Sequence, residues 1–174
     1  LTKITSLAVA DVMAEILNSV SNSSSIHIKW PNDIYIDDKK VAGILIENYL
    51  REHTIQHAIV GVGINVNQAV FHTAPGAVSL FSLTHQTFDL MQCMDLFCQY
   101  FEARYLQLKA NKRSRLDEDY RRYLYRLNEW SPYRTPANQF FEGNIKGVSD
   151  IGKLQVEVIS GEIKEFDLKE IVFL

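Results

Sequence analysis

The side chains best suited to chemistry lie close together in the first quarter of the chain. Lys29, Asn32 and Asp33 are near neighbours, and Lys40 follows after a short polar connection. Two ammonium groups and one carboxylate can gather an anionic ligand and stabilise charge that develops on it. Pro31 keeps the backbone extended ahead of a turn. We therefore expect a hairpin to bring Lys40 back beside this loop, pointing into a cleft.

Three glycines downstream predict where a ligand approaches the backbone. Gly43 interrupts an apolar run, and Gly61 and Gly63 interrupt a later one. A glycine within a strand removes a side chain where another group comes close. Asn65 offers a donor and an acceptor that match a nucleobase edge or a ribose. Taken singly, these residues also fit a structural interpretation: Lys29 is a solvated edge residue, the Asn-Asp pair forms a turn, and the glycines mark bulges.

The surrounding sequence predicts the elements that position this group. Apolar residues at helical spacing predict a helix over 2–20, which a run of serines ends. Alternating residues predict a strand over 26–30 and a hairpin over 34–50, with the polar residues 37–40 as its connection. A further apolar run predicts a strand over 55–66. These strands are expected to form one sheet.

Helices are predicted after this sheet. Residues 68–85 show no clear period and predict a long loop beside the site. Apolar residues spaced by three and four predict an amphipathic helix over 90–108, which Thr87 could cap. A capping-box variant that starts at Ser114 predicts another helix, which continues to Leu127.

The last part of the chain changes in composition at Pro132 and Pro136 and predicts a small all-β unit. Its predicted strands are 140–148, 154–159, 163–166 and 171–174. We therefore expect an α+β protein with two domains, one over 1–127 and one over 128–174.

Composition excludes several classes of protein. The 174 residues carry a net charge of −3, which indicates neither nucleic acid nor membrane as a partner. No apolar run reaches the roughly 18 residues of a membrane span. Cys93 and Cys98 are predicted to be core thiols, and the lack of a disulfide framework favours the cytoplasm. Leu1 is not a start methionine, so we expect the chain to begin within a larger protein.

Two runs of residues carry a resemblance to a known family. Residues 29–33 read Lys-Trp-Pro-Asn-Asp, and residues 40–47 read Lys-Val-Ala-Gly-Ile-Leu-Ile-Glu after a six-residue gap. They resemble the KWPND…KxxGIL(I/V)E signature of biotin protein ligases, and residues 61–67 resemble the GxGINxN strand of that family. The resemblance is strong over 1–67 and loose as far as Leu127. It implies a class II synthetase-like core with a mixed sheet, followed by a small SH3-like C-terminal β-barrel.

The resemblance also implies a reaction. Members of the family activate biotin with ATP to biotinyl-5′-AMP, with Mg²⁺ accompanying ATP. They then transfer biotin to a lysine of a biotin carboxyl carrier protein. Lys40 matches the family lysine that contacts the biotinyl carbonyl and the phosphate. Asp33 would orient Lys40 or the incoming amine, and Lys29 would support the phosphates or the fold.

Other positions are expected to bind substrate. Gly43 and Ile44 would form the floor of the biotin and adenylate site, and Asn65 would meet the adenosine. Three further residues complete the predicted substrate-binding set: Asn32, Gly61 and Gly63. The family's glycine- and arginine-rich GRGRxGR loop has no match in these residues, so we expect the chain alone to be inactive or weakened. An apolar face left open would favour a homodimer.

Three alternatives remain open. A lipoate or octanoate ligase or transferase shares the fold and a reactive-site lysine. A biotin-sensing transcriptional repressor would need an upstream helix-turn-helix, and the basic run 112–115 is too short for a DNA surface. A metal site at His53 and His57 would require helical spacing where the sequence predicts strand and turn.

Overall fold

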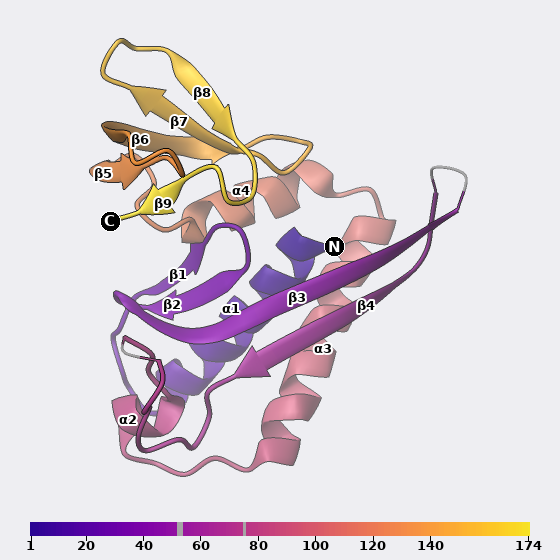
Figure 1. Ribbon diagram of the computed structural model, residues 1–174. Coiled ribbons are helices and arrows are strands. Elements are labelled where there is room, and N and C mark those ends of the chain that lie inside the picture. Colours follow the sequence, from indigo (N-terminus) through magenta and orange to yellow (C-terminus); the bar gives the residue numbers. More distant parts are fainter. Residues whose placement is uncertain (52–53, 75) are drawn as a thin grey trace. The chain divides into compact units, whose positions relative to one another are not determined.

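The computed structural model describes residues 1–51, 54–74 and 76–174. These residues form two units, 1–123 and 124–174, and each unit has its own sheet (Figure 1). The boundary between the units lies after residue 123, four residues before the predicted boundary after residue 127. The α+β class predicted from the sequence is confirmed, although the named strands of both sheets pair antiparallel instead of forming a mixed sheet.

Helix α1 (Thr2–Ser19) forms the support beneath the first sheet. It packs against β1, β2 and β3, and lies behind them in Figure 1. Its apolar side chains are almost fully buried, as the helical spacing predicts. The buried set is Ile4, Leu7, Ala8, Val9, Ala10, Val12, Met13, Ile16 and Leu17.

The first sheet has the order β1-β2-β3-β4. Its strands are β1 (Ile26–Lys29), β2 (Asp33–Ile36), β3 (Lys39–Arg51) and β4 (Thr54–Ile64). Because Ile36 pairs with Lys39, the β2–β3 turn consists of two residues and not the four predicted. Asp37 in this turn has a φ of 52°, the left-handed conformation that two-residue hairpins require.

Three helices follow the sheet, and their ends differ from the predicted ones. A short helix, α2 (Leu80–Thr84), lies inside the predicted loop. Helix α3 (Leu90–Lys109) is capped by Asp89, whose carboxylate accepts two backbone N–H groups, and not by Thr87. Helix α4 (Arg113–Tyr123) begins before Ser114, so the predicted capping box and the extension to residue 127 are wrong.

Arg104 ties the three long helices of the first unit together. Its guanidinium donates two hydrogen bonds to Asp11 on α1, at 2.7 and 3.0 Å, and one to Asp119 on α4 at 2.7 Å. The hydrogen bonds that Arg104 donates to Asp11, and then the one to Asp119, raise the pKa of Arg104 above its ordinary value despite partial burial. This face of α3 also buries Cys93, whereas Cys98 is exposed, so the prediction of two core thiols holds for only one of them.

The second unit is a five-stranded antiparallel sheet of order β8-β7-β6-β5-β9. Its strands are β5 (Trp130–Arg134), β6 (Phe140–Val148), β7 (Leu154–Val158), β8 (Ile163–Phe166) and β9 (Val172–Phe173). Strand β5 is not among the predicted strands, because a proline in the middle of a segment argues against a strand. A Cβ atom at Gly143 would lie 2.4 Å from a methyl group of buried Val156. Only glycine fits there.

In the described parts of the chain, no helix is long and apolar enough to cross a membrane.

Candidate functional site

One face of the first sheet carries most of the predicted site. Lys29 pairs with Asp33, Asp33 with Gly43, and Gly43 with Gly63. Directly paired residues of adjacent strands point to the same face. These four residues therefore form one row across all four strands. The opposite face is buried against α1, so the row lies on the open side of the sheet.

A β-bulge places Lys40 on this open face. Ile34 pairs with Ala42, whereas Tyr35 pairs with Lys40, so Val41 has no partner of its own in β2. Val41 and Ala42 are both buried as a result. With strict alternation from Gly43, Lys40 would point into the core. A bulge of this kind re-aims a side chain by inserting one residue.

Lys40 and Asp33 form an ion pair on the open face. The Nζ atom lies 2.6 Å from a carboxylate oxygen of Asp33, and the two side chains are 43% and 25% exposed. A Cβ atom at Gly43 would lie 3.3 Å from both Cε and Nζ of Lys40, so the absence of a side chain gives the ammonium group its place. The ion pair remains accessible to a ligand from the solvent side.

Lys29 contacts a residue that the sequence reasoning missed. Its ammonium group donates a hydrogen bond to the hydroxyl of Tyr35 at 3.1 Å and lies 4.8 Å from the centre of that ring. Tyr35 follows Asp33 by two positions in β2, and this spacing, which puts both residues on one face, was the available signal.

Asn32 and Ile44 have structural roles at the edge of the row. The Asn32 side-chain amide donates to the Ile44 carbonyl at 2.6 Å, and the Ile44 N–H donates to the Asn32 carbonyl at 2.9 Å. The Ile44 side chain is only 3% exposed and belongs to the face that packs on α1. Its side chain therefore lies away from the open face, and only its backbone adjoins the predicted floor.

Gly61 and Gly63 leave the open face flat. A Cβ atom would lie 3.5 Å from the Leu45 carbonyl oxygen at Gly61, and 3.9 Å from the Gly43 carbonyl oxygen at Gly63. These are ordinary contact distances, so packing within the sheet does not require glycine at either position. The β3–β4 register is unbroken there, which contradicts the interpretation of these glycines as bulges. The space above the backbone can accept a planar group.

Asn65 fastens a neighbouring segment to the sheet beside Lys40. Its side-chain amide donates to the Val78 carbonyl at 3.1 Å, and its backbone N–H donates to Val41 at 2.9 Å. The Lys40 backbone pairs with the same segment: its N–H donates to Gly76 at 3.1 Å, and its carbonyl accepts from Val78 at 2.8 Å. Both sides of the Lys40 backbone are therefore fixed.

Comparisons with known proteins agree with this geometry. The model of the biotin/lipoate A/B protein ligase family matches residues 1–65. The bifunctional ligase/repressor BirA of Bacillus subtilis is 32% identical over 139 residues, which are 77% of this chain and 42% of that protein. The biotin–[acetyl-CoA-carboxylase] ligase of Mycobacterium tuberculosis is 30% identical over 131 residues, 75% of this chain and 47% of that protein. Residues 1–65 therefore belong to the biotin/lipoate A/B protein ligase family, and the chain is similar to biotin protein ligases over most of its length.

The chain spans about half the length of these curated relatives of the family. Its fold is also similar to that of the apo biotin protein ligase from Aquifex aeolicus, with a TM-score of 0.78 and 23% identity. That comparison covers 99% of this chain and 73% of the other. It shows a shared fold.

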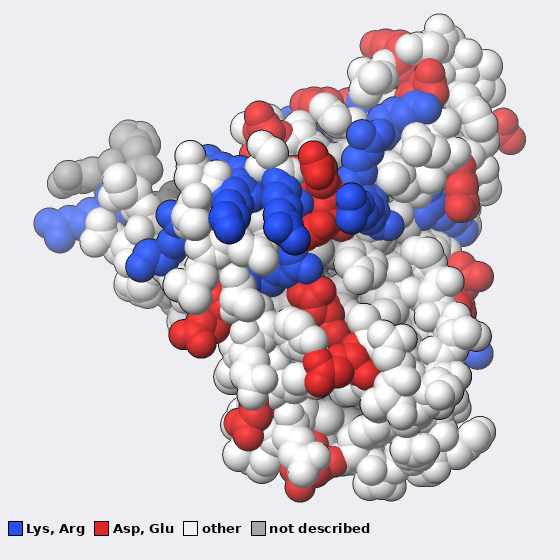
Figure 2. Space-filling model, turned by 180° about the vertical axis from the view of Figure 1, so that it is seen from behind, with Lys and Arg blue, Asp and Glu red and all other residues white. Residues whose placement is uncertain are grey.

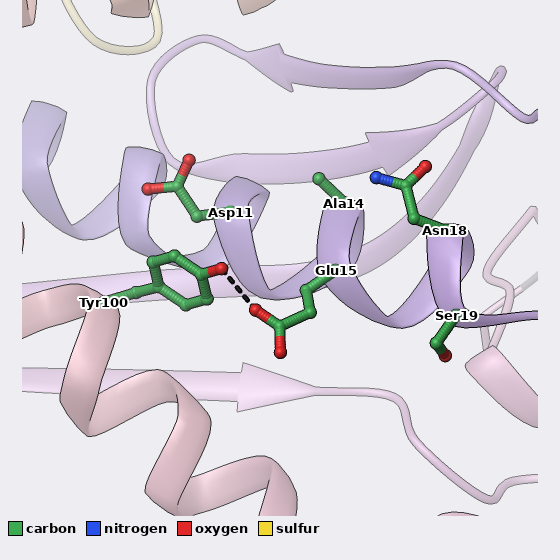
Figure 3. A pocket seen from close by; sticks show the side chains of 6 residues that line it. All are labelled: Asp11, Ala14, Glu15, Asn18, Ser19 and Tyr100. Carbon is green, nitrogen blue, oxygen red and sulfur yellow. Dashed lines mark hydrogen bonds between the residues drawn. The ribbon is translucent and has the colours of Figure 1, made fainter.

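A separate cavity lies between α1 and α3 (Figure 3), with a volume of about 580 Å³. Tyr100 points from α3 towards α1, and its hydroxyl donates a hydrogen bond to Glu15. This bond, with smaller effects of burial and nearby carboxylates, raises the pKa of Tyr100 to about 12. Asp11, on the same wall, is held by Arg104. The polar groups here join two helices, and we interpret the cavity as part of their packing.

Among residues 1–51, 54–74 and 76–174, no group of three or more His, Cys, Asp or Glu side chains could hold a metal ion. His57 stacks on Tyr49 with ring centres 4.4 Å apart, and His53 lies outside the described residues. Figure 2 shows basic side chains over α4 with acidic ones among them. Asp117 and Asp119 of this helix form ion pairs with Lys3 of α1 and Arg104 of α3.

Proposed function

We propose that this chain is the lysine-bearing part of a biotin protein ligase. Such an enzyme joins biotin to ATP, forms biotinyl-5′-AMP, and passes biotin to a specific lysine of a biotin carboxyl carrier protein. The observation that carries the proposal is the Lys40–Asp33 pair beside Gly43, on a face lined by glycines. The relatives in the same family, named as biotin ligases, support the assignment.

In the first step a biotin carboxylate oxygen attacks the α-phosphorus of ATP. The bond between that phosphorus and the bridging oxygen breaks, and pyrophosphate leaves with the electron pair. Negative charge grows on the phosphoryl oxygens, and the Lys40 ammonium group can stabilise it without giving up its proton. Asp33 holds this ammonium group in place before the ligand arrives, so little reorganisation is needed.

In the second step the acceptor lysine amine attacks the biotinyl carbonyl. An amide bond forms, the bond between the carbonyl carbon and the AMP oxygen breaks, and the amine loses a proton. Lys40 can stabilise the carbonyl oxygen as it gains charge, and Asp33 lies close enough to Lys40 to orient the incoming amine. Mg²⁺ would arrive bound to ATP, and none of the described residues is assigned to hold it.

The ligand would lie over the glycines of the open face. Gly43, Gly61 and Gly63 give a planar group direct access to the backbone. Asn65 lies at the end of β4, where the adenosine is expected, and Lys29 lies at the other end of the row. An acyl adenylate has a charged phosphate, which would lie between the two lysines, and a flat ring, which would lie over the glycines.

The remaining parts of the proposal concern the setting of the enzyme. We infer that residues 124–174 form the small SH3-like C-terminal domain of the family, and that the two free thiols indicate the reducing cytoplasm.

Leu45 and Ile59 are 65% and 53% exposed on the open face of β3 and β4, which supports a homodimer. Analytical ultracentrifugation over a range of concentrations tests self-association, and a constant monomer mass would refute it.

The deciding experiment is ATP–pyrophosphate exchange with biotin, lipoate or octanoate as the acid. It is run on this chain alone and on a longer form that carries a glycine- and arginine-rich segment ahead of Leu1. We expect exchange with biotin only, and stronger exchange from the longer form. Exchange with lipoate or octanoate alone would favour the related ligases that the family model also covers. No exchange from the longer form would overturn the proposed function.

A further inference from the structure

Tyr35 lies between the two lysines of the open face. It pairs directly with Lys40 on β3, and on β1 its direct partner is His27, which places Lys29 on the adjacent diagonal. Long side chains on diagonal positions of one face are within reach of each other. Asp33 stands two positions earlier in the same strand. Tyr35 is therefore central to the charged group while carrying no charge itself.

Two contacts join Tyr35 to Lys29. The Tyr35 hydroxyl accepts a hydrogen bond from the ammonium group at 3.1 Å, and the same nitrogen lies 4.8 Å from the ring centre. A cation held near the face of an aromatic ring is attracted by the electrons of that ring. The two contacts act on one nitrogen atom, so together they fix its position better than either would alone.

The two lysines are thus anchored in different ways. Lys40 is held by the carboxylate of Asp33 at 2.6 Å, whereas Lys29 is held by a phenol ring and its hydroxyl. The phenol of Tyr35 restrains the Lys29 ammonium group without adding a negative charge beside it. A lysine side chain loses considerable conformational entropy when it is fixed. If the site fixes it before the ligand binds, this loss no longer weakens binding.

We propose that Tyr35 is a positioning residue that fixes the Lys29 ammonium group for the phosphate groups of ATP. The inference rests on the proposed function for its ligand, and on the register and contacts of Tyr35 for its geometry. Lys40 serves the reacting α-phosphate and the carbonyl, and Lys29 serves the neighbouring phosphate charge. Tyr35 acts on the ligand only through Lys29.

The first test measures the mobility of Lys29 without any ligand. Lysine side chains of this chain are labelled with ¹³C at Cε, and NMR relaxation gives an order parameter for each. We expect Lys29 to be restrained in the unaltered chain, more mobile in Tyr35→Phe, which keeps the ring, and more mobile still in Tyr35→Leu. Tyr49→Leu, at the far end of β3, is the matched control and should leave Lys29 unchanged. Equal restraint in Tyr35→Leu would overturn the proposal.

The second test measures the affinity for ATP by calorimetric titration. Tyr35→Phe should weaken ATP binding about threefold to tenfold, the range expected for the loss of one ordinary hydrogen bond. In a Lys29→Ala background the same substitution should have no further effect. A loss that persists without Lys29 would show that Tyr35 acts by another route and would refute the positioning role. If neither the unaltered chain nor the longer form binds ATP, the proposed function fails, and the mobility of Lys29 is then the test of Tyr35.

Discussion

Replacing Lys40 with alanine should lower activity strongly and stability only slightly. The ion pair with Asp33 is short, at 2.6 Å, but its two side chains are 43% and 25% exposed. Such accessible pairs contribute about 1 kcal/mol or less, because water and salt screen them and two side chains must be ordered. We therefore expect Lys40→Ala to lower the free energy of unfolding by no more than about 1 kcal/mol. The backbone bonds of residue 40 to Gly76 and Val78 survive the change.

The effect on catalysis should be far larger. Removing one preorganised group that stabilises developing charge costs about 100-fold to 1000-fold in rate, or roughly 3–4 kcal/mol of barrier. We expect that loss in biotin-dependent ATP–pyrophosphate exchange. Urea unfolding monitored by circular dichroism measures the stability of the same variant. Lys39→Ala is the matched control, because Lys39 is an exposed neighbour in the same strand.

Two results would refute this reasoning. Exchange by Lys40→Ala within about threefold of the unaltered protein would show that the ammonium group does not stabilise charge in the reaction. A loss of stability above about 3 kcal/mol would show instead that Lys40 holds the hairpin together, because no accessible ion pair contributes so much. Similar losses of exchange in Lys40→Ala and Lys39→Ala would point to a general effect of charge.

Three further predictions concern other parts of the fold. Gly143→Ala should destabilise the second unit by about 1–3 kcal/mol in thermal unfolding, since its methyl group would overlap a buried valine; unchanged stability would contradict the packing described. Because folding raises the pKa of Tyr100 from 10.0 to about 12, its stabilising effect should be complete below pH 10.0 and lost as the pH rises through 12. Glu15→Gln should return the phenolate titration towards 10.0, and an unmoved titration would exclude the hydrogen bond as the cause. In native protein a thiol reagent should modify exposed Cys98 quickly and Cys93 slowly, because burial raises the pKa of the Cys93 thiol; equal rates would refute that burial.

The sequence by itself determined much of the local structure near the site. The helical spacing of apolar residues located α1 and alternation located β1, and a continuous apolar run located β4. The motifs around Lys29, Asp33, Lys40 and Gly43 identified the residues that the sheet register then placed on or beside one face. Helix ends were predicted less well, since several nearby side chains can each cap a helix and local pattern does not select among them.

Only the tertiary structure decided which way these side chains point. Side chains in a strand alternate strictly, so the sequence places Gly43 and Lys40 on opposite faces of β3. The inserted Val41 shifts the register by one residue and turns Lys40 to the open face beside Asp33. Pairing with β2 and burial of both Val41 and Ala42 against the core stabilise that shift. These contacts involve residues from separate elements, and no pattern within a single strand contains them.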